Sequence, residues 1–238
     1  MIKNPDKWCF AWFASKPYAN AMERAALLKA NKWPDQSKIS IAFLDGDPDV
    51  QKRVQAAALG WVKPGMANLE FAFQNDPATA LIRISFRYQG SWSVIGTTCE
   101  SVAKTQPTMN FGWLAPRSSD GEVQRVVLHE FGHALGLIHE HQNPGSEIHW
   151  NKGQVEKELS GPPNNWDQQT IEHNMFEPYG KGETNFTAVD PLSIMMYPIP
   201  PTWTTDGFSA GLNSTLSGTD ISFIRKEYGT KPTFGTNN

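Results

Sequence analysis

The spacing of apolar residues divides the chain into a regular first part and an irregular second part. Short apolar or alternating runs predict strands, and apolar residues that recur every three to four positions predict helices. The strands expected from these runs are 39–44, 69–73, 81–88 and 108–114. The helices expected are 23–31, 50–62, 120–135, 152–159, 167–175 and 219–228. Strands that alternate with helices in this way predict an α/β layer with a mixed sheet.

The texture of the sequence changes after residue 139. Residues 140–218 are rich in proline, asparagine, glycine and threonine, and they contain few strand-like runs. We therefore expect a regular upper half, an irregular lower half and a cleft between them, where ligands commonly bind. The last helix is expected to be capped by Thr219, and residues 229–238 are expected to be disordered.

Composition excludes some classes of partner. A formal net charge of −3 and a pI of about 6.1 give no reason to expect nucleic acid or an anionic membrane as partner. No apolar run has transmembrane length. Residues 1–7 lack the apolar core of a signal peptide, so export would require a signal already removed or another route. Cys9 and Cys99 are too few for a disulfide framework, but in an exported chain we predict that they pair.

Three imidazoles and a carboxylate gather at the end of the helix expected over 120–135, which a capping box at Ser119 and Glu122 begins. The stretch from 129 to 139 reads H-E-x-x-H-x-x-G-x-x-H. His129 and His133 are one helical turn apart and can bind the same ion. A glycine at 136 allows a sharp turn that brings His139 back as a third ligand.

This set of side chains predicts a catalytic zinc site rather than a structural one. Three histidine ligands leave a fourth position open for water. Glu130 lies beside the ligands and can accept a proton from that water without binding the metal itself. His141, His149 and His173 lie in or near loops, and we expect them to be solvated rather than metal-bound.

A second motif, in the lower half, resembles a known family. Residues 193–197 read S-I-M-M-Y, which resembles the Met-turn that follows the extended histidine motif in metzincins. Glu140 directly follows the third histidine, where astacins carry glutamate. The chain therefore resembles an astacin-type metzincin zinc metallopeptidase, of the microbial astacin-like endopeptidase kind, over roughly residues 39–229.

The resemblance implies an α+β fold of the metzincin, or zincin-like, type. An upper subdomain would hold a twisted mixed β-sheet and two long helices. An irregular lower subdomain would carry a C-terminal helix, with the zinc cleft between the two. The implied division is an N-terminal extension, 1–38, packed on a single catalytic domain, 39–230, with a tail at 231–238. The upper subdomain would be 39–139 and the lower one 140–230.

The resemblance also implies a role for each motif residue. One Zn²⁺ would be bound by His129, His133 and His139, with Tyr197 as a mobile fifth ligand. Glu130 would act as general base, and Tyr197 would donate to the oxyanion. Met195 would form an apolar floor under the imidazoles.

The substrate and setting follow from the same resemblance. The strand at 109–113 would pair with an extended protein or peptide substrate. The enzyme is expected to be secreted and monomeric. Astacins prefer an acidic residue after the scissile bond, but residues 198–208 contain no lysine or arginine. Ile199, Trp203 and Phe208 instead predict cleavage before bulky apolar residues, and Asp206 would disfavour acidic ones.

Two departures from the family pattern affect these expectations. Met196 stands where the family usually has histidine. Nearly forty residues precede the first strand, so Glu140 is expected to meet a local backbone group or a basic side chain rather than a mature amino terminus. Cys9 is a candidate to block the metal, but its neighbours Trp8 and Phe10 do not match the known matrixin cysteine switch.

Two alternatives to an active peptidase remain open. One is a non-catalytic zinc-binding or recognition module that kept the fold. The other is a latent zymogen, in which residues 1–36 cover the cleft. Glu130 favours the enzyme over the binding module, because a module has no use for a carboxylate beside the metal-site water.

Overall fold

A six-stranded mixed sheet forms one side of the molecule. The computed structural model describes residues 9–12, 31–162, 164–178 and 188–233. The strand order is β1-β5-β6-β4-β2-β3, and β5 runs antiparallel to β6 while the other neighbours are parallel. The strands are β1 (Cys9–Trp12), β2 (Lys38–Phe43), β3 (Glu70–Phe73), β4 (Ile82–Ser85), β5 (Ser91–Val94) and β6 (Met109–Phe111).

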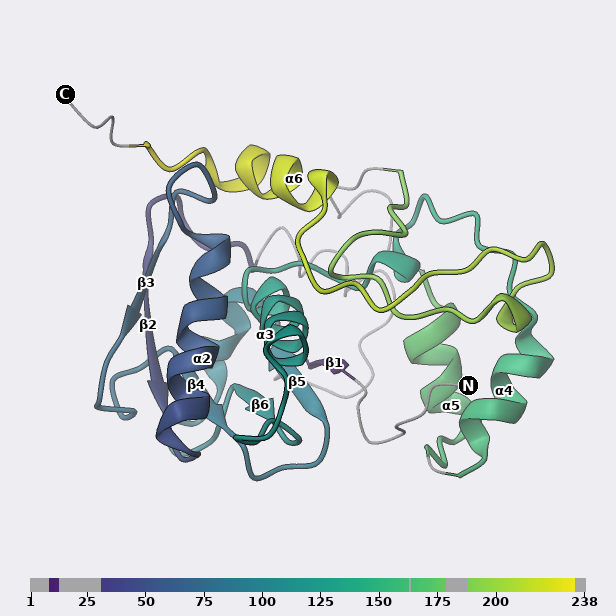
Figure 1. Cartoon of the computed structure of the whole chain (residues 1–238), viewed down its shortest axis with the longest axis horizontal. Helices are drawn as coiled ribbons and strands as arrows, with labels where there is room; N and C mark the ends of the chain where they lie inside the picture. Colours follow the sequence, from purple (N-terminus) through teal and green to yellow (C-terminus); the bar gives the residue numbers. More distant parts are fainter. Residues whose placement is uncertain (1–8, 13–30, 163, 179–187, 234–238) are drawn as a thin grey trace.

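Two helices pack side by side next to the sheet, and the others lie beyond them (Figure 1). The α-helices are α2 (Pro48–Ala58), α3 (Asp120–Ala134), α4 (Lys152–Ser160), α5 (Gln168–Ile171) and α6 (Gly218–Tyr228). Short helical turns are η1 (Leu59–Trp61), η2 (Gly96–Ser101), η3 (Glu140–Gln142), η4 (Glu172–Phe176) and η5 (Pro201–Trp203). The helix expected over 23–31 lies outside the described residues, except for its last residue. The α+β class with a mixed sheet is confirmed.

The expectation that residues 81–88 form one strand with alternating apolar and polar side chains is wrong. Only Ile82–Ser85 form a strand, and all four of its side chains are buried. A central parallel strand is covered on both faces, so it has no solvent side for a polar residue to occupy. Arg83 is buried there because its guanidinium donates to five backbone carbonyls, those of Ala80, Leu81, Val102, Ala103 and Gln106.

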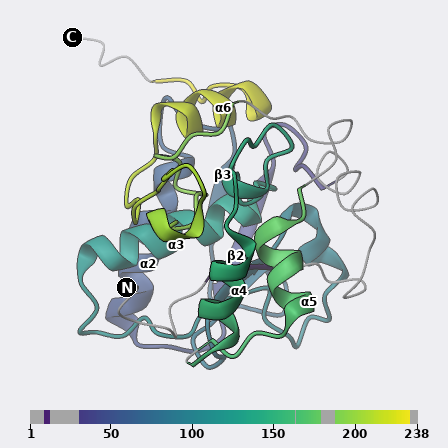
Figure 2. The same ribbon diagram turned by 90° about the vertical axis from the view of Figure 1, so that its right-hand side faces the viewer.

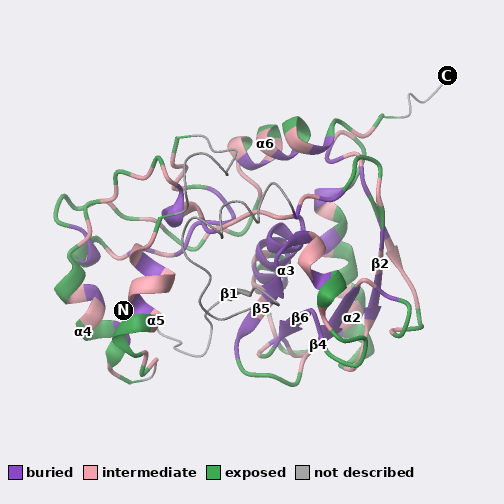
Figure 3. Cartoon of the chain, turned by 180° about the vertical axis from the view of Figure 1, so that it is seen from behind, coloured by how far each residue is buried: buried purple, intermediate pink, exposed green. Residues whose placement is uncertain are grey.

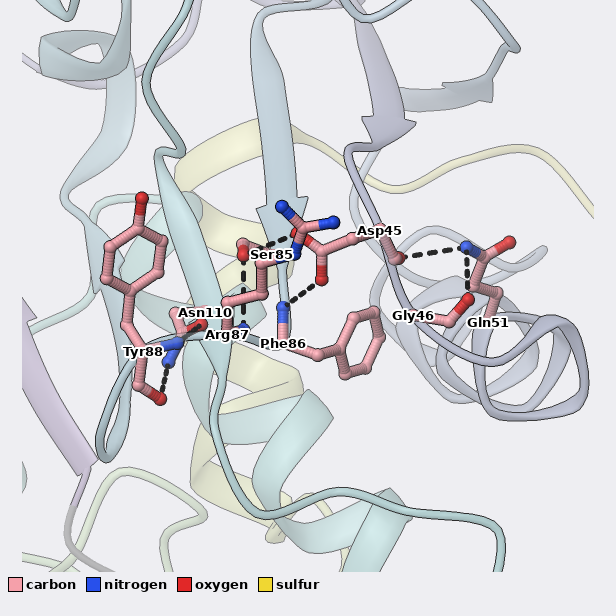
Figure 4. Close-up of polar contacts among 8 residues, drawn as sticks. All are labelled: Asp45, Gly46, Gln51, Ser85, Phe86, Arg87, Tyr88 and Asn110. Atoms are coloured by element: carbon pink, nitrogen blue, oxygen red, sulfur yellow. Dashed lines mark hydrogen bonds and ion pairs between the residues drawn. The ribbon is translucent and has the colours of Figure 1, made fainter.

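Strand β5 was not predicted, because its serines make it look like a loop. The chain reverses between β4 and β5, and Asn110 of β6 fixes this turn (Figure 4). The Asn110 amide donates to the carbonyls of Tyr88, at 2.9 Å, and Gly90, at 2.7 Å, while its own oxygen accepts from Tyr88 N. A buried amide thereby sets the direction of the antiparallel strand.

Asp45 fixes the other side of the same turn. It follows β2, and its carboxylate accepts from Ser85 Oγ and Phe86 N, each at 2.8 Å (Figure 4). Arg87 lies 3.5 Å from the same carboxylate. These contacts join the carboxyl ends of the neighbouring strands β2 and β4. The turn that contains Asp45, at 45–48, therefore holds the turn after β4 in place and also leads into α2.

The side chains form two hydrophobic clusters. The larger one lies between the sheet and helices α2, α3 and α6, and Trp33 and Met195 belong to it. The smaller one lies between α4, α5 and the segment at 196–203. Figure 2 shows α4 and α5 together below α6. Figure 3 shows that α3, between the two groups of elements, is buried over most of its length.

Two helix starts differ from expectation by a few residues. Helix α2 begins at Pro48, capped by the side chain of Asp47, because proline is well suited to the first helical position. Helix α6 is capped by Ser217 rather than Thr219, and Ser217 and Asp220 form a reciprocal capping box. In each case the acceptor that caps the helix lies just upstream of the residue expected to begin it.

The C-terminal segment is ordered further than expected. Lys231 N donates to Met66 O at 2.7 Å, and Gly65 N donates to Lys231 O at 3.0 Å. The prediction that disorder begins at 229 is therefore wrong for residues 229–231. Residues 234–238 lie outside the described part. Among the described residues, no helix has the length and apolar character needed to span a membrane.

The predicted disulfide is absent. Cys99 is a free, buried thiol on η2. Burial raises the pKa of the Cys99 thiol to about 12, so the thiolate needed for exchange is scarce at neutral pH. The side chain of Cys9 lies outside the described residues.

Candidate active site

Helix α3 is the platform of the site. Ser119 begins it, accepting from Glu122 N at 3.3 Å, as the sequence predicts. The helix ends at Ala134, within one residue of expectation. Trp61 Nε1 donates to Leu128 O at 2.9 Å and ties α2 and η1 to the same turn that carries the first histidine. The platform is therefore buried and braced from a neighbouring element.

The helix ends in a Schellman motif, which returns the third histidine to the site. Gly136 has φ +92°, a conformation that glycine adopts without strain. Gly136 N donates to His133 O at 2.8 Å, and Leu137 N donates to Gly132 O at 3.0 Å. The prediction that Gly136 makes a sharp turn is confirmed.

The three imidazoles of the motif come together. Their candidate ligand atoms all lie within 4.8 Å of one another, and the Nε2 atoms of His133 and His139 are 3.1 Å apart. His129 Nδ1 lies 2.8 Å from Ile194 O, and His133 Nδ1 lies 2.8 Å from Leu137 O. A carbonyl oxygen only accepts, so each Nδ1 carries the proton and each Nε2 presents a lone pair.

This donor set fits a zinc ion. Burial lowers the pKa of His129 and His139 well below the usual range, and that of His133 to about 4. All three rings are therefore neutral at neutral pH, the form that binds metal. His129 Nε2 is a buried nitrogen with no protein partner, and such an orphaned acceptor is explained by an ion.

The Met-turn lies directly against the histidine motif. Glu140 N donates to Met195 O at 3.0 Å, and Ile194 O accepts from His129. A Cβ at Gly132 would strike the sulfur of Met195. The missing side chain in the helix thus makes room for the methionine that packs beside the imidazoles.

Helix α6 holds the Met-turn and the end of α3. Asp220 is 6% exposed, and its carboxylate accepts from Ser193 Oγ at 2.7 Å and from Ile194 N at 2.8 Å. At the other end of α6, Tyr228 Oη donates to Leu135 O at 2.6 Å. Both contacts were missed from the sequence, because the partners are far apart along the chain.

Tyr197 lies among the site histidines. Its ring centroid is 4.2 Å from that of His139 and 4.7 Å from that of His141, which stacks on it. The expectation that His141 is solvated is wrong: it is 3% exposed, and its Nε2 bonds Asn174 O. It is not among the clustered metal-binding candidates, so it packs beside the site without joining it.

The two glutamates of the motif have different surroundings. Glu130 is completely buried, beside His129 on α3. Glu140 is partly buried, and its Oε1 accepts from Asp190 N at 3.1 Å and from Asn143 Nδ2 at 3.2 Å. Glu140 thus meets a backbone group, as expected, but that group belongs to Asp190, which is distant along the chain, and its local partner is the Asn143 side chain.

Of the two remaining histidines, His149 is exposed and His173 is half-buried. His149 Nδ1 lies 3.0 Å from Asp206, and His173 Nδ1 lies 3.0 Å from Glu177. Neither belongs to the clustered candidates among the described residues.

The strand expected to pair with substrate is not available. Strand β6 is hydrogen-bonded to β4 on one side and to β5 on the other, so it has no open edge. The outer neighbour of β5 is β1, which runs parallel to it. The expectation that residues 109–113 receive the substrate is wrong.

The fold and the site together define a zinc peptidase of the metzincin type. Residues 26–229 match the model of one family of peptidases, described as Astacin. The chain belongs to the astacin family, and its three clustered histidines form the zinc-binding triad. No curated protein sequence matches the chain significantly.

Several solved structures are similar to this chain. A structure of myroilysin shares 41% sequence identity, with a TM-score of 0.81, over 84% of this chain and 97% of that one. A crystal structure of myroilysin shares 38% identity, with a TM-score of 0.67, over 93% and 90%. A hatching enzyme zinc-protease, HCE-1 of the medaka fish Oryzias latipes, shares 17% identity with a TM-score of 0.57, over 85% and 96%, and supports the fold alone.

The contact between Gly132 and Met195 gives a testable prediction. Gly132→Ala should displace Met195 and destabilise the zinc-free protein by about 1–3 kcal/mol, the usual range for overpacking. Gly121→Ala is the matched control on the same helix, because a Cβ there meets nothing within 4 Å. Thermal unfolding of both variants measures the difference. Equal stabilities would show that Met195 yields without cost.

Proposed function

We propose that the protein is an endopeptidase that hydrolyses peptide bonds by attack of a water molecule, with Glu130 as the general base. One observation carries this proposal: a glutamate buried on the same helix turn as His129, beside three converging neutral imidazoles. Glutamate side chains are seldom fully buried, and a buried carboxylate next to a metal-binding group is a candidate for a functional role. Its position suits proton transfer, because it adjoins the ligand group without being part of it.

The proposed steps assign one task to each residue. His129, His133 and His139 would hold the zinc ion, which when bound would supply a Lewis acid to polarise the scissile carbonyl and to lower the pKa of a water molecule. Glu130 takes the proton of the attacking water and passes it to the leaving amine. Tyr197, also proposed as a fifth zinc ligand in the absence of substrate, donates its hydroxyl proton in a hydrogen bond to the developing oxyanion. Its ring contacts with His139 and His141 support this placement.

A latent form is a second candidate, and the pairing of β1 with β5 favours it. Residues Cys9–Trp12 occupy the outer edge of β5, in parallel register from Cys9 with Ser91 to Trp12 with Val94. An extended substrate that adds to this sheet would need the same backbone groups. We propose that substrate pairs with β5 after β1 has left.

Wider features of the protein are proposals as well. We propose that residues 39–230 form one catalytic domain, with subdomains 39–139 and 140–230, an extension at 1–38 and a tail at 231–238. The resemblance to astacin-type enzymes supports action outside the cell. The large apolar side chains exposed in the described part are Leu59, Tyr88, Leu192 and Leu212, and so few of them support a monomer.

Replacement of the general base tests the proposed function. Glu130→Gln should keep zinc, because the triad is intact, and lose nearly all hydrolysis of casein and peptides. Glu122→Gln, in the first turn of the same helix, is the matched control and should keep full activity. Zinc content by atomic absorption and turnover of a fluorogenic peptide provide the two measurements. Wild-type turnover in Glu130→Gln would defeat the assignment.

Tyr197→Phe removes the hydroxyl group of Tyr197 and keeps its ring, so it tests the hydroxyl alone. The variant should fold and bind zinc, since the ring contacts remain, but its kcat should fall by roughly 10²-fold, as for loss of one oxyanion donor. Tyr88→Phe at the exposed turn before β5 serves as the control. An unchanged kcat in Tyr197→Phe would show that the Tyr197 hydroxyl has no part in the mechanism.

Removal of residues 1–12 tests the latent form. We expect kcat/KM on peptide substrates to rise several-fold, because the edge of β5 is opened. Circular dichroism checks that the shortened chain is folded. The same deletion in Glu130→Gln should stay inactive, which rules out a contaminating protease. If kcat/KM of the shortened chain equals that of the full chain, β1 does not block the substrate.

The specificity expected from the sequence is changed in detail by the structure. Ile199 and Trp203 are buried in the smaller hydrophobic cluster. They can therefore support the residues that contact the substrate, but they offer no exposed surface to it themselves. Lys152, a candidate to supply a positive charge, is paired with Glu172 at 3.1 Å and lies over the Phe176 ring. A second candidate, Lys181, lies outside the described residues.

We therefore predict cleavage mainly before bulky apolar residues. An unpaired substrate carboxylate would cost several kcal/mol in such a site, or roughly 100-fold or more in kcat/KM. Mass-spectrometric mapping of cuts in a proteome-derived peptide library measures the preference. A majority of cuts before aspartate or glutamate would refute it.

A further inference from the structure

A chain of hydrogen bonds connects the Asp220 carboxylate to the first histidine of the triad. Ser193 Oγ donates to Asp220 Oδ1 at 2.7 Å. Met195 N donates to Ser193 Oγ at 3.0 Å. The carbonyl of the same peptide group, Ile194 O, lies 2.8 Å from His129 Nδ1. We call this series, from Asp220 through Ser193 and the Ile194–Met195 peptide to His129, the relay.

The direction of every bond in the relay is fixed by chemistry. A carboxylate only accepts, so the Ser193 hydroxyl proton points toward Asp220 and the hydroxyl oxygen is left to accept from Met195 N–H. A carbonyl only accepts, so the proton in the last bond belongs to His129 Nδ1. Each bond therefore polarises the next in the same sense, from the imidazole toward the carboxylate.

The relay is shielded from water. Asp220 is 6% exposed, Ser193 2% and His129 4%. Hydrogen bonds that run in one sense strengthen one another when the local dielectric constant is low. A carboxylate at one end and a metal-binding imidazole at the other are the same two components as in the direct carboxylate–histidine pairs of zinc sites.

The Ser193 branch is not needed to hold the Met-turn in place. Asp220 Oδ2 already accepts from Ile194 N at 2.8 Å and from Ser217 N at 2.9 Å. Asn213 Nδ2 also donates to Ser193 O at 2.8 Å. The turn is thus anchored by backbone contacts, and the hydroxyl adds a path that leads to His129.

We propose that Asp220 is a positioning residue for the zinc ligand His129. It acts through Ser193 and the Ile194–Met195 peptide, in the role that a directly bonded carboxylate plays for the histidines of other zinc sites. The proposal rests on the zinc site of the proposed function. Asp220 strengthens the hydrogen bond by which Ile194 O holds the Nδ1–H tautomer of His129, and so helps keep the Nε2 lone pair directed at the ion. It also makes that nitrogen a stronger donor to the metal.

Two substitutions of similar size separate the relay from simple anchoring. Ser193→Ala removes the hydroxyl and breaks the relay, while the Ile194 N contact with Asp220 stays. Ser217→Ala removes the cap of α6, where Asp220 N donates to Ser217 Oγ at 3.0 Å, and leaves the relay intact. A general loss of stability would affect both variants alike, whereas loss of the relay affects only the first.

Zinc affinity is measured by competition with a chromophoric chelator, in the full chain and without substrate. We expect Ser193→Ala to bind zinc roughly 10-fold more weakly, the lower end of the effect of removing a direct partner of a histidine ligand, because Ile194 O remains. Ser217→Ala should match the wild type within a factor of about two, the scatter expected for a residue outside the relay. Equal zinc affinity in Ser193→Ala and Ser217→Ala would overturn the proposal.

A metal-free readout keeps the test independent of zinc chemistry. Nitrogen-15 NMR of the zinc-free protein reports the tautomer of His129 and, through the Nδ1–H proton resonance, the strength of its hydrogen bond to Ile194 O. Ser193→Ala should keep the Nδ1–H tautomer, because Ile194 O remains, but its Nδ1–H resonance should move upfield from the position shared by the wild type and Ser217→Ala. An unchanged spectrum in Ser193→Ala would also overturn the proposal. Neither measurement uses hydrolysis, so a failure of the proposed peptidase mechanism would be seen separately, in Glu130→Gln.

Discussion

The structure depends on keeping three imidazoles neutral and fixed in a region shielded from bulk solvent. Burial lowers the pKa of each ring, and backbone carbonyls take the Nδ1 protons of His129 and His133. Buried groups of this kind are tolerated only when their protons and lone pairs have partners. The Schellman turn, the Met-turn and α6 all supply those partners or hold them in place.

The two hydrophobic clusters divide this task between them. The larger cluster contains α3 and Met195, and so fixes the ligands that lie on the helix. The smaller one contains Met196 and Tyr197, and so places the phenol proposed for catalysis. Two consecutive residues of the Met-turn therefore belong to different clusters. The turn is the point at which the packing of one part of the protein sets the position of groups in the other.

Local patterns in the sequence predict the site better than the sheet. Helix α3, its Ser119 cap and the turn at Gly136 were predicted because each depends on neighbours within a few residues. The burial of Arg83 could not be predicted, since its partners are carbonyls that only the folded chain brings together. Strand β5 was missed for a similar reason, because pairing with β6 rather than its own composition makes it a strand.

The position of α6 in the chain has a consequence for the order in which the protein is made. The three histidine ligands precede residue 140, but Asp220 and Tyr228, which fix the Met-turn and the end of α3, belong to helix α6. Synthesis proceeds from the amino terminus, so these groups reach the folding domain last. A nascent chain that already carries the histidine triad therefore still lacks the groups of α6 that brace the Met-turn and the end of α3. The active site is completed only when synthesis of the domain is almost finished.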